Sequence, residues 1–309
     1  MARRVDLKRA EGKLLHRPLC LGNWKMNKSP QEARAFCQEL KSLLEEAQTS
    51  HAASAAIGAS DKTAKSSATQ PLAQMVLLPP ALTLWAVAES LQGTEIAYGG
   101  QNCHFEISGA FTGENSPKVL QEVGAQYCLV GHSERRKLFH ETNDLCAQKL
   151  KALIELGLTP ILCVGESLEE RQSGRTEALV LEQLREALKL AKGDGRFKTP
   201  GTQGSATPQG QAVPGGGFPL IVAYEPVWAI GTGQVATVEQ VGEVHQLLRQ
   251  ELDQLLGSEL SQNIPLVYGG SVKPENGAEL LAIPAVDGFL IGGASLDAKS
   301  FFALAQLGF

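Results

Sequence analysis

The chain has 309 residues, of which 43 % are hydrophobic and 20 % are charged, a balance typical of a folded globular protein. The formal net charge of −5 argues against a nucleic-acid partner, and the absence of any run of eighteen apolar residues argues against a membrane span. The six cysteines form no C-x-x-C pair, so neither a disulfide framework nor a zinc site is expected. Reduced thiols and a cytoplasmic location fit this pattern best.

Three segments differ in composition from the rest. Residues 1–17 carry six Lys or Arg against two acidic residues and contain no apolar stretch of a secretory signal, so we expect a basic tail, with a transit peptide as the alternative. Residues 49–70 are rich in Ala, Ser and Thr, and residues 193–217 in Gly, Pro, Gln and Thr. Neither insert can bury enough apolar surface to offset its ordering entropy, so both are expected to be loops or disordered.

Eight short apolar runs alternate with helical patterns along the remaining, roughly 245 residues, a size typical of one α/β barrel. In chain order the runs are 18–22, 75–79, 96–98, 127–130, 159–164, 219–224, 264–268 and 287–291.

Several helices between these runs have clear boundary signals. Ser29-Pro30-Gln31-Glu32 is a capping box, followed by apolar residues at helical spacing as far as Ala47. A second capping box, Thr237-Val238-Glu239-Gln240, predicts a helix that reaches about Leu256. Further helices are expected after Ser116-Pro117 and over 143–155 and 176–191.

Strands that alternate with helices predict a parallel sheet, and eight strands are the number that closes it into a (β/α)8 barrel. A doubly wound open sheet is the alternative. We expect one barrel domain over 18–309. Both inserts follow a helix and precede a strand, which in a barrel places them on the face away from the active site. Deletion of residues 50–70 is therefore expected to leave turnover nearly unchanged.

Chemistry-bearing residues follow three of the predicted strands, whose carboxyl ends build the active site of such a barrel. Lys25 could face an anionic substrate. His132 precedes a helix, whose positive end favours the neutral imidazole. Glu225 follows three apolar residues, so desolvation would raise its basicity. Each residue alone also fits a structural role, as a surface lysine, a capping histidine or a strand-end glutamate.

Glycine pairs end the last two runs, in Gly269-Gly270-Ser271 and in Gly292-Gly293. Exposed backbone N–H groups at these two strand ends match the usual phosphate site of a barrel. The segment after Glu225 has Pro226 at one end and glycines at the other, which suits a closing lid. A carboxylate base, a neutral electrophile, a lysine, a phosphate cradle and a lid together suit proton abstraction next to the carbonyl of a small phosphorylated sugar.

These motifs, taken together and in this order, resemble the triosephosphate isomerase family. The matching segments are Gly22-Asn23-Trp24-Lys25-Met26-Asn27, Gly131-His132-Ser133-Glu134-Arg135-Arg136, residues 223–233, Tyr268-Gly269-Gly270-Ser271 and residues 287–296. Gly109-Ala110-Phe111-Thr112-Gly113-Glu114 is similar to the family's interdigitating loop. The resemblance implies a TIM barrel that interconverts dihydroxyacetone phosphate and D-glyceraldehyde 3-phosphate in glycolysis and gluconeogenesis, without a cofactor.

The resemblance also implies residue roles. Glu225 would be the base that moves a proton between C1 and C2, and His132 the neutral electrophile. Asn23 and Lys25 would support the substrate, with Glu134 beside Lys25. The phosphate would be bound by Gly231, Ser271, Gly292 and Gly293, under a lid formed by residues 226–236.

The family's homodimer is implied as well, with Thr112 reaching the partner near its Asn23 and Lys25, and Glu114 pairing with Arg135. The lid ends in Gln234-Val235-Ala236 where Lys-Thr-Ala is common, so a stiff valine could alter its opening. Cys163 matches a common cysteine of the fifth strand and is expected to pack near Glu225.

Two other functions remain open at this point. A barrel that binds phosphorylated ligands without chemistry would lack the base, the histidine or the lysine, yet all three are present. A metal-dependent epimerase or aldolase would need clustered ligands, and the six histidines show no such spacing, so no metal is expected.

Overall fold

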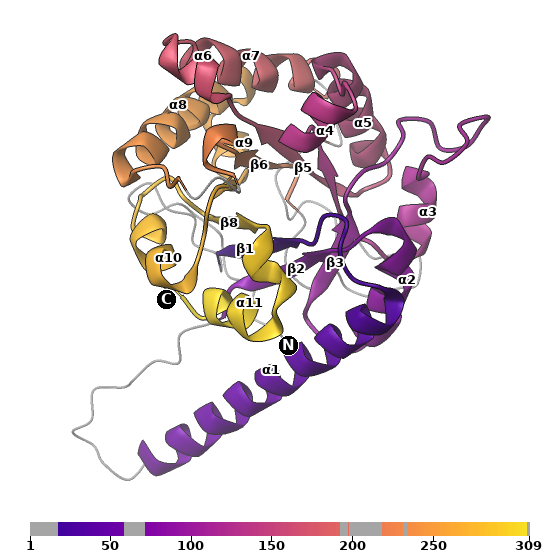
Figure 1. The fold of residues 1–309 in the computed structure, drawn as a ribbon, viewed down its shortest axis with the longest axis vertical. Helices are drawn as coiled ribbons and strands as arrows, with labels where there is room; N and C mark the ends of the chain where they lie inside the picture. Colours follow the sequence, from indigo (N-terminus) through magenta and orange to yellow (C-terminus); the bar gives the residue numbers. More distant parts are fainter. Residues whose placement is uncertain (1–17, 59–71, 192–196, 198–217, 231–233, 308–309) are drawn as a thin grey trace.

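The computed structural model describes residues 18–58, 72–191, 197, 218–230 and 234–307. Eight parallel strands close into a barrel in chain order, with β8 beside β1 (Figure 1). They are β1 (Leu19–Asn23), β2 (Gln74–Leu78), β3 (Ala97–Gly100), β4 (Tyr127–Val130), β5 (Thr159–Val164), β6 (Ile221–Tyr224), β7 (Leu266–Tyr268) and β8 (Gly288–Ile291). The predicted (β/α)8 barrel is confirmed, and the open-sheet alternative is wrong.

Helices surround the strands in an outer layer (Figure 1). They are α1 (Pro30–Gly58), α2 (Ala81–Ser90), α3 (Pro117–Glu122), α4 (Ser133–Leu138), α5 (Asn143–Glu155), α6 (Leu168–Gln172), α7 (Thr176–Leu188), α8 (Val238–Leu256), α9 (Ser258–Ser261), α10 (Pro274–Leu281) and α11 (Ala298–Ala305). Two short 3-10 helices, η1 (Val227–Ala229) and η2 (Gly293–Leu296), lie in the loops after β6 and β8.

Side-chain caps fix several helix starts where the sequence predicts them. The Thr237 hydroxyl accepts the N–H of Gln240, whose side chain in turn accepts the N–H of Thr237, so the predicted capping box at the start of α8 forms. At the start of α5, the Thr142 hydroxyl accepts the N–H of Leu145. The Ser29–Glu32 box before α1 also forms.

Alternation along the strands builds two apolar layers. Leu19 and Leu21 of β1 point into the barrel interior, where they join Tyr127 and Ile161 from across the sheet. Cys20, between them, faces the layer that the helices cover. Because side chains fill the interior, the barrel is a packed core and only its ends are available for a site.

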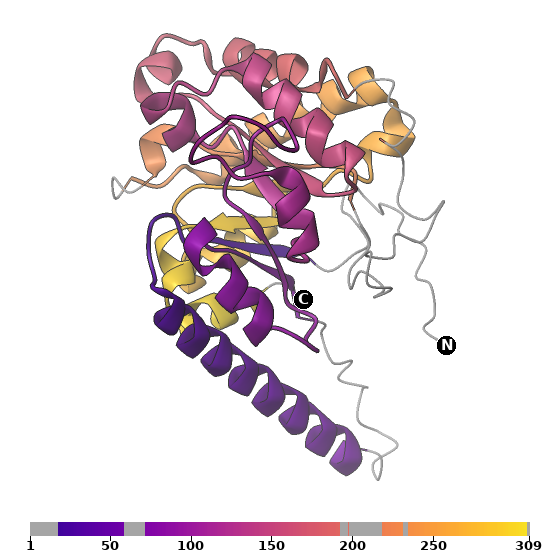
Figure 2. The ribbon, with the colours of Figure 1, turned by 90° about the vertical axis from the view of Figure 1, so that its right-hand side faces the viewer.

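Helix α1 is longer than the sequence predicts. It continues to Gly58, so the expectation of a loop beginning at Thr49 is wrong for residues 49–58, and the end of the helix projects beyond the barrel (Figure 2). The local reason is the alanine-rich sequence of residues 52–56, Ala-Ala-Ser-Ala-Ala, which favours a helix and contains neither Gly nor Pro.

The inserts lie where the barrel topology predicts them. One joins α1 to β2 and the other joins α7 to β6, so both enter the amino ends of strands. Residues 59–70 and all of 193–217 except Phe197 lie outside the described residues, as does the predicted basic tail. Phe197 is only 5 % exposed and packs into the outer apolar layer, so this position of the second insert is anchored.

Candidate active site

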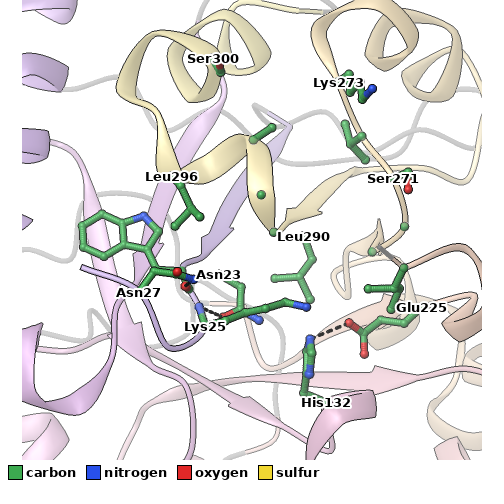
Figure 3. Close-up of a pocket in the computed structure, with 18 of the residues that line it drawn as sticks. Asn23, Lys25, Asn27, His132, Glu225, Ser271, Lys273, Leu290, Leu296 and Ser300 are labelled. Carbon is green, nitrogen blue, oxygen red and sulfur yellow. Dashed lines mark hydrogen bonds and ion pairs between the residues drawn. The ribbon is translucent and has the colours of Figure 1, made fainter. Parts of the chain in front are cut away.

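A cavity of about 670 Å³ opens at the carboxyl ends of the strands (Figure 3). Most of the residues singled out from the sequence line it, each contributed by the loop or strand end at its own position in the barrel. These residues are Asn23 at the end of β1, Lys25 after β1, His132 after β4, Glu225 after β6, Ser271 after β7, and Gly292 and Gly293 after β8. Gly231 lies outside the described residues.

Glu225 and His132 form a direct pair on one side of this cavity. Oε1 of Glu225 lies 3.0 Å from Nε2 of His132, and Oε2 accepts the backbone N–H of Ser133 at 3.0 Å (Figure 3). Both side chains are almost fully buried. Burial raises the pKa of the Glu225 carboxyl, but His132, the Ser133 N–H and the Lys25 charge together outweigh it and hold the pKa below its ordinary value.

The hydrogen bonds of His132 define its neutral tautomer. His132 is the N-cap of α4, and its Nδ1 accepts the N–H of Glu134 at 3.2 Å. A ring nitrogen that accepts carries no proton, so the neutral imidazole has its hydrogen on Nε2, which donates to Glu225. Burial lowers the pKa of His132, but the facing Glu225 carboxylate and Glu134 raise it above its ordinary value while the two side chains touch.

Lys25 reaches the same region from β1. Its ammonium lies 2.5 Å from Oε1 of Glu134, and its backbone N–H donates to the Asn23 side chain at 3.0 Å. Glu134 does not itself line the cavity, but it contacts Lys25, and its second carboxylate oxygen lies 3.7 Å from Nδ1 of His132. The predicted cluster of Asn23, Lys25, His132 and Glu134 therefore exists as a connected set.

The opposite wall of the cavity is formed by glycine-rich backbone. A Cβ atom added at Gly293 would meet nothing within 4 Å, so the backbone there is open to a ligand. Nearby, the Ser271 hydroxyl donates to the carbonyl of Ala229 at 2.8 Å and thereby ties the β7 loop to the segment after β6. Exposed backbone at two adjacent strand ends is the arrangement that binds a phosphate group.

Glu166 is a residue that the sequence reasoning missed. It is fully buried after β5, and its Oε1 accepts from Trp228 Nε1 at 2.8 Å, from Tyr224 at 3.2 Å and from Arg171 at 3.1 Å. The N–H of Val227 also donates to its backbone carbonyl. Glu166 therefore anchors the start of the predicted lid. Only Gly165 separates it from the end of β5, so the strand-end argument that predicts Glu225 also applies to it.

Two glycines bring other backbone segments against Glu225. A Cβ at Gly165 would lie 1.8 Å from the Glu225 carbonyl oxygen, and one at Gly269 would lie 2.8 Å from its Cγ. Only glycine fits at either position. Cys163 is also fully buried beside Glu225, whose negative charge adds to burial in raising the pKa of the thiol, so the predicted packing role is confirmed.

The expected pairing of Glu114 with Arg135 does not occur within one chain. Arg135 instead pairs with the buried Glu141 at 2.5 Å, which also accepts from Lys149 at 2.8 Å. The buried Glu141 carboxylate accepts hydrogen bonds from two cationic side chains and from the Gly131 N–H. It therefore binds Arg135 in preference to the exposed Glu114.

A closed eightfold barrel whose strand ends present a buried carboxylate–imidazole pair opposite a glycine-rich cradle defines an acid–base enzyme of the (β/α)8 class. A sequence profile of the triosephosphate isomerase family matches residues 18–308. The chain belongs to the triosephosphate isomerase family.

Curated relatives agree with this assignment over nearly their whole length. The chain is 42 % identical to a triosephosphate isomerase of Carboxydothermus hydrogenoformans, covering 94 % of this chain and 99 % of the relative. It is 45 % identical to one of Bdellovibrio bacteriovorus, covering 92 % and 97 %. A Thermus thermophilus relative of the same name is 40 % identical, covering 95 % and 99 %.

Proposed function

We propose that Glu225, His132 and Lys25 carry out the family's reaction in this barrel, the interconversion of dihydroxyacetone phosphate and D-glyceraldehyde 3-phosphate. The observation that carries the assignment is the 3.0 Å contact between the Glu225 carboxylate and His132 Nε2 in the cavity wall. A three-carbon substrate that enters between these two groups would meet a base on carbon and a hydrogen-bond donor on oxygen at the same time.

In the proposed reaction, Glu225 removes a proton from C1 of dihydroxyacetone phosphate. The electron pair of the C–H bond forms a C1–C2 double bond, and the carbonyl electrons become the negative charge on O2. His132 Nε2–H donates to the two oxygens and passes a proton between them. Glu225 then returns its proton to C2, which gives glyceraldehyde 3-phosphate. Substrate and product are isomers, so the step consumes no oxidant or reductant, and we expect neither cofactor nor metal.

Lys25 supplies the positive charge that faces the enediolate, and Asn23 supports it through the Lys25 N–H. The phosphate is bound by backbone N–H groups at Ser271, Gly292, Gly293 and Gly231. Glu134 holds the Lys25 ammonium, and residues 226–236 close over the ligand, which excludes water from the enediolate.

The test is a coupled assay with each triose phosphate, in the presence and absence of a strong chelator. Turnover in both directions that is unchanged by the chelator supports the proposal. Calorimetric binding of a triose phosphate without turnover would instead identify a ligand-binding scaffold. Loss of activity with the chelator would identify a metal-dependent barrel enzyme.

We propose further that two copies of this chain pair through the loop 109–114, with Thr112 of each copy reaching into the other copy near Asn23 and Lys25. The support is a set of apolar side chains that are exposed in the single chain, including Met26 at 95 %, Leu82 at 91 % and Trp85 at 60 %. The connection from β3 to α3, which contains this loop, projects from the barrel in Figure 1. Inside it, the His104 and Phe111 rings stack at 3.9 Å.

We also propose that the protein is located in the cytoplasm. Among the described residues, no helix is both long enough and apolar enough to cross a membrane.

A further inference from the structure

Lys25 has a backbone conformation that a non-glycine residue rarely adopts. Its φ angle is +52°, in the left-handed region where a Cβ crowds the backbone. Such a conformation persists only where the surroundings hold it. Two side chains do so here, because the Lys25 N–H donates to Asn23 Oδ1 at 3.0 Å and its carbonyl accepts from Gln101 Nε2 at 2.8 Å.

Gln101 is the less expected of these two partners. It follows β3 directly, and its side-chain amide also donates to the carbonyl of Leu78, the last residue of β2, at 2.8 Å. The same Leu78 carbonyl accepts the N–H of Trp24 at 3.1 Å. One amide group therefore joins the carboxyl ends of β2 and β3 to the loop that carries Lys25, and it uses both of its hydrogens to do so.

The direction of the Lys25 side chain depends on this backbone conformation. At φ +52° the ammonium reaches Glu134, and the Lys25 Cε lies 3.6 Å from the position of a Cβ added at Gly292, in the glycine cradle. A relaxed φ would turn the Cα–Cβ bond and carry the ammonium away from the cradle.

We propose that Gln101 is a positioning residue, which fixes Lys25 in its left-handed conformation and thereby places the ammonium against an anionic substrate. The inference rests on the proposed role of Lys25. Gln101 is not among the residues that line the cavity, so removal of its amide should weaken ligand binding only when Lys25 is present.

A double-mutant cycle tests this dependence through binding of glycerol 3-phosphate, measured by calorimetry. Gln101→Leu is expected to weaken binding about tenfold, and Lys25→Met to weaken it about 30-fold or more. The double variant should bind like Lys25→Met alone, within about twofold. A general structural defect would instead multiply the two losses. Multiplied losses, or wild-type binding by Gln101→Leu, would overturn the proposal.

Two further variants keep the test sharp. Gln121→Leu removes another glutamine amide that donates to a backbone carbonyl, that of Leu156, and should bind glycerol 3-phosphate like the wild type. Gln101→Met keeps the length and neutrality of the side chain but removes its two donors, so it should reproduce the tenfold loss if Gln101→Leu fails to fold. The readout is binding, so a wild-type protein that binds without isomerising would contradict the proposed function and leave this cycle interpretable.

Discussion

The two rims of this barrel use buried polar groups in different ways. At the carboxyl rim, Glu225 contacts His132 and Lys25 pairs with Glu134 around an open cavity. At the amino rim, Asp287 accepts the N–H of Leu266 at 2.8 Å and pairs with Arg249, which donates to the carbonyl of Ile264 at 2.7 Å. The polar groups at the carboxyl rim leave room for a ligand, whereas those at the amino rim join strands to helices.

This difference explains where the chain tolerates extra residues. Both inserts enter at the amino rim, where the polar groups hold the fold and are remote from the cavity. Variants at the carboxyl rim should therefore change turnover with little effect on stability, and variants at the amino rim should do the reverse.

The largest effect is expected from removing the electrophile. His132→Asn should lower kcat/KM by about 10²- to 10³-fold, because a shorter amide cannot donate to both substrate oxygens from the same position. The coupled assay measures it. His140→Asn is the matched control, since His140 is exposed at φ +54°, which asparagine tolerates, and it should keep wild-type kinetics. Equal losses in the two variants would contradict the assigned role.

A smaller but clear loss is expected from blocking the proposed dimer. Thr112→Arg places a charge at the tip of the loop that would be buried against the partner, so it should shift the protein to monomers in sizing with light scattering and lower turnover about tenfold or more. Thr49→Arg, on exposed α1, should do neither. A dimeric and fully active Thr112→Arg protein would show that this loop is not the interface.

The amino rim should respond in stability instead. His245 is fully buried, with its Nδ1 3.0 Å from the Ala285 carbonyl oxygen and with Tyr224, Arg249 and Asp287 nearby, and burial lowers its pKa to about 4. In the unfolded chain this imidazole would bind its proton near pH 6.5. The free energy of unfolding is therefore highest above pH 6.5, and protonation of His245 in the unfolded chain lowers it by about 3 kcal/mol as the pH drops to 4.

Urea unfolding at several pH values measures this effect. His245→Asn should be less stable at pH 7.5 but lose less stability between pH 6.5 and 4, with kcat/KM at pH 7.5 nearly unchanged. The raised pKa of His132 acts with the opposite sign in both proteins, so the difference between them isolates His245. Parallel pH profiles would count against the buried imidazole as the cause.

The smallest effect is expected from shortening the first insert. Deletion of residues 50–70 removes the projecting end of α1 and should leave kcat/KM within about twofold, because the cavity lies at the other rim. A folded, dimeric deletion protein with a large loss of turnover would show that the insert supports the site.

Local signals in the sequence account for much of the fold. Caps at Thr142 and Thr237 and alternation in the strands predict helix starts and the barrel, because these features act between neighbouring residues. The low hydrophobicity of residues 49–58 predicts a loop, but alanine favours a helix even without burial, so α1 extends to Gly58. Both partners of Gln101, and the Tyr224 and Trp228 partners of Glu166, lie more than 20 residues away in the chain, so no local pattern assigns these contacts.

Proton exchange with solvent is the most direct test of Glu225 as the base. Dihydroxyacetone phosphate incubated with the protein in D₂O should gain deuterium at C1, followed by NMR, at a rate that Glu225→Gln lowers by a factor of about 10³ or more, while glycerol 3-phosphate binding persists. Exchange at the wild-type rate in a folded Glu225→Gln protein would contradict the account, because another group would then remove the proton.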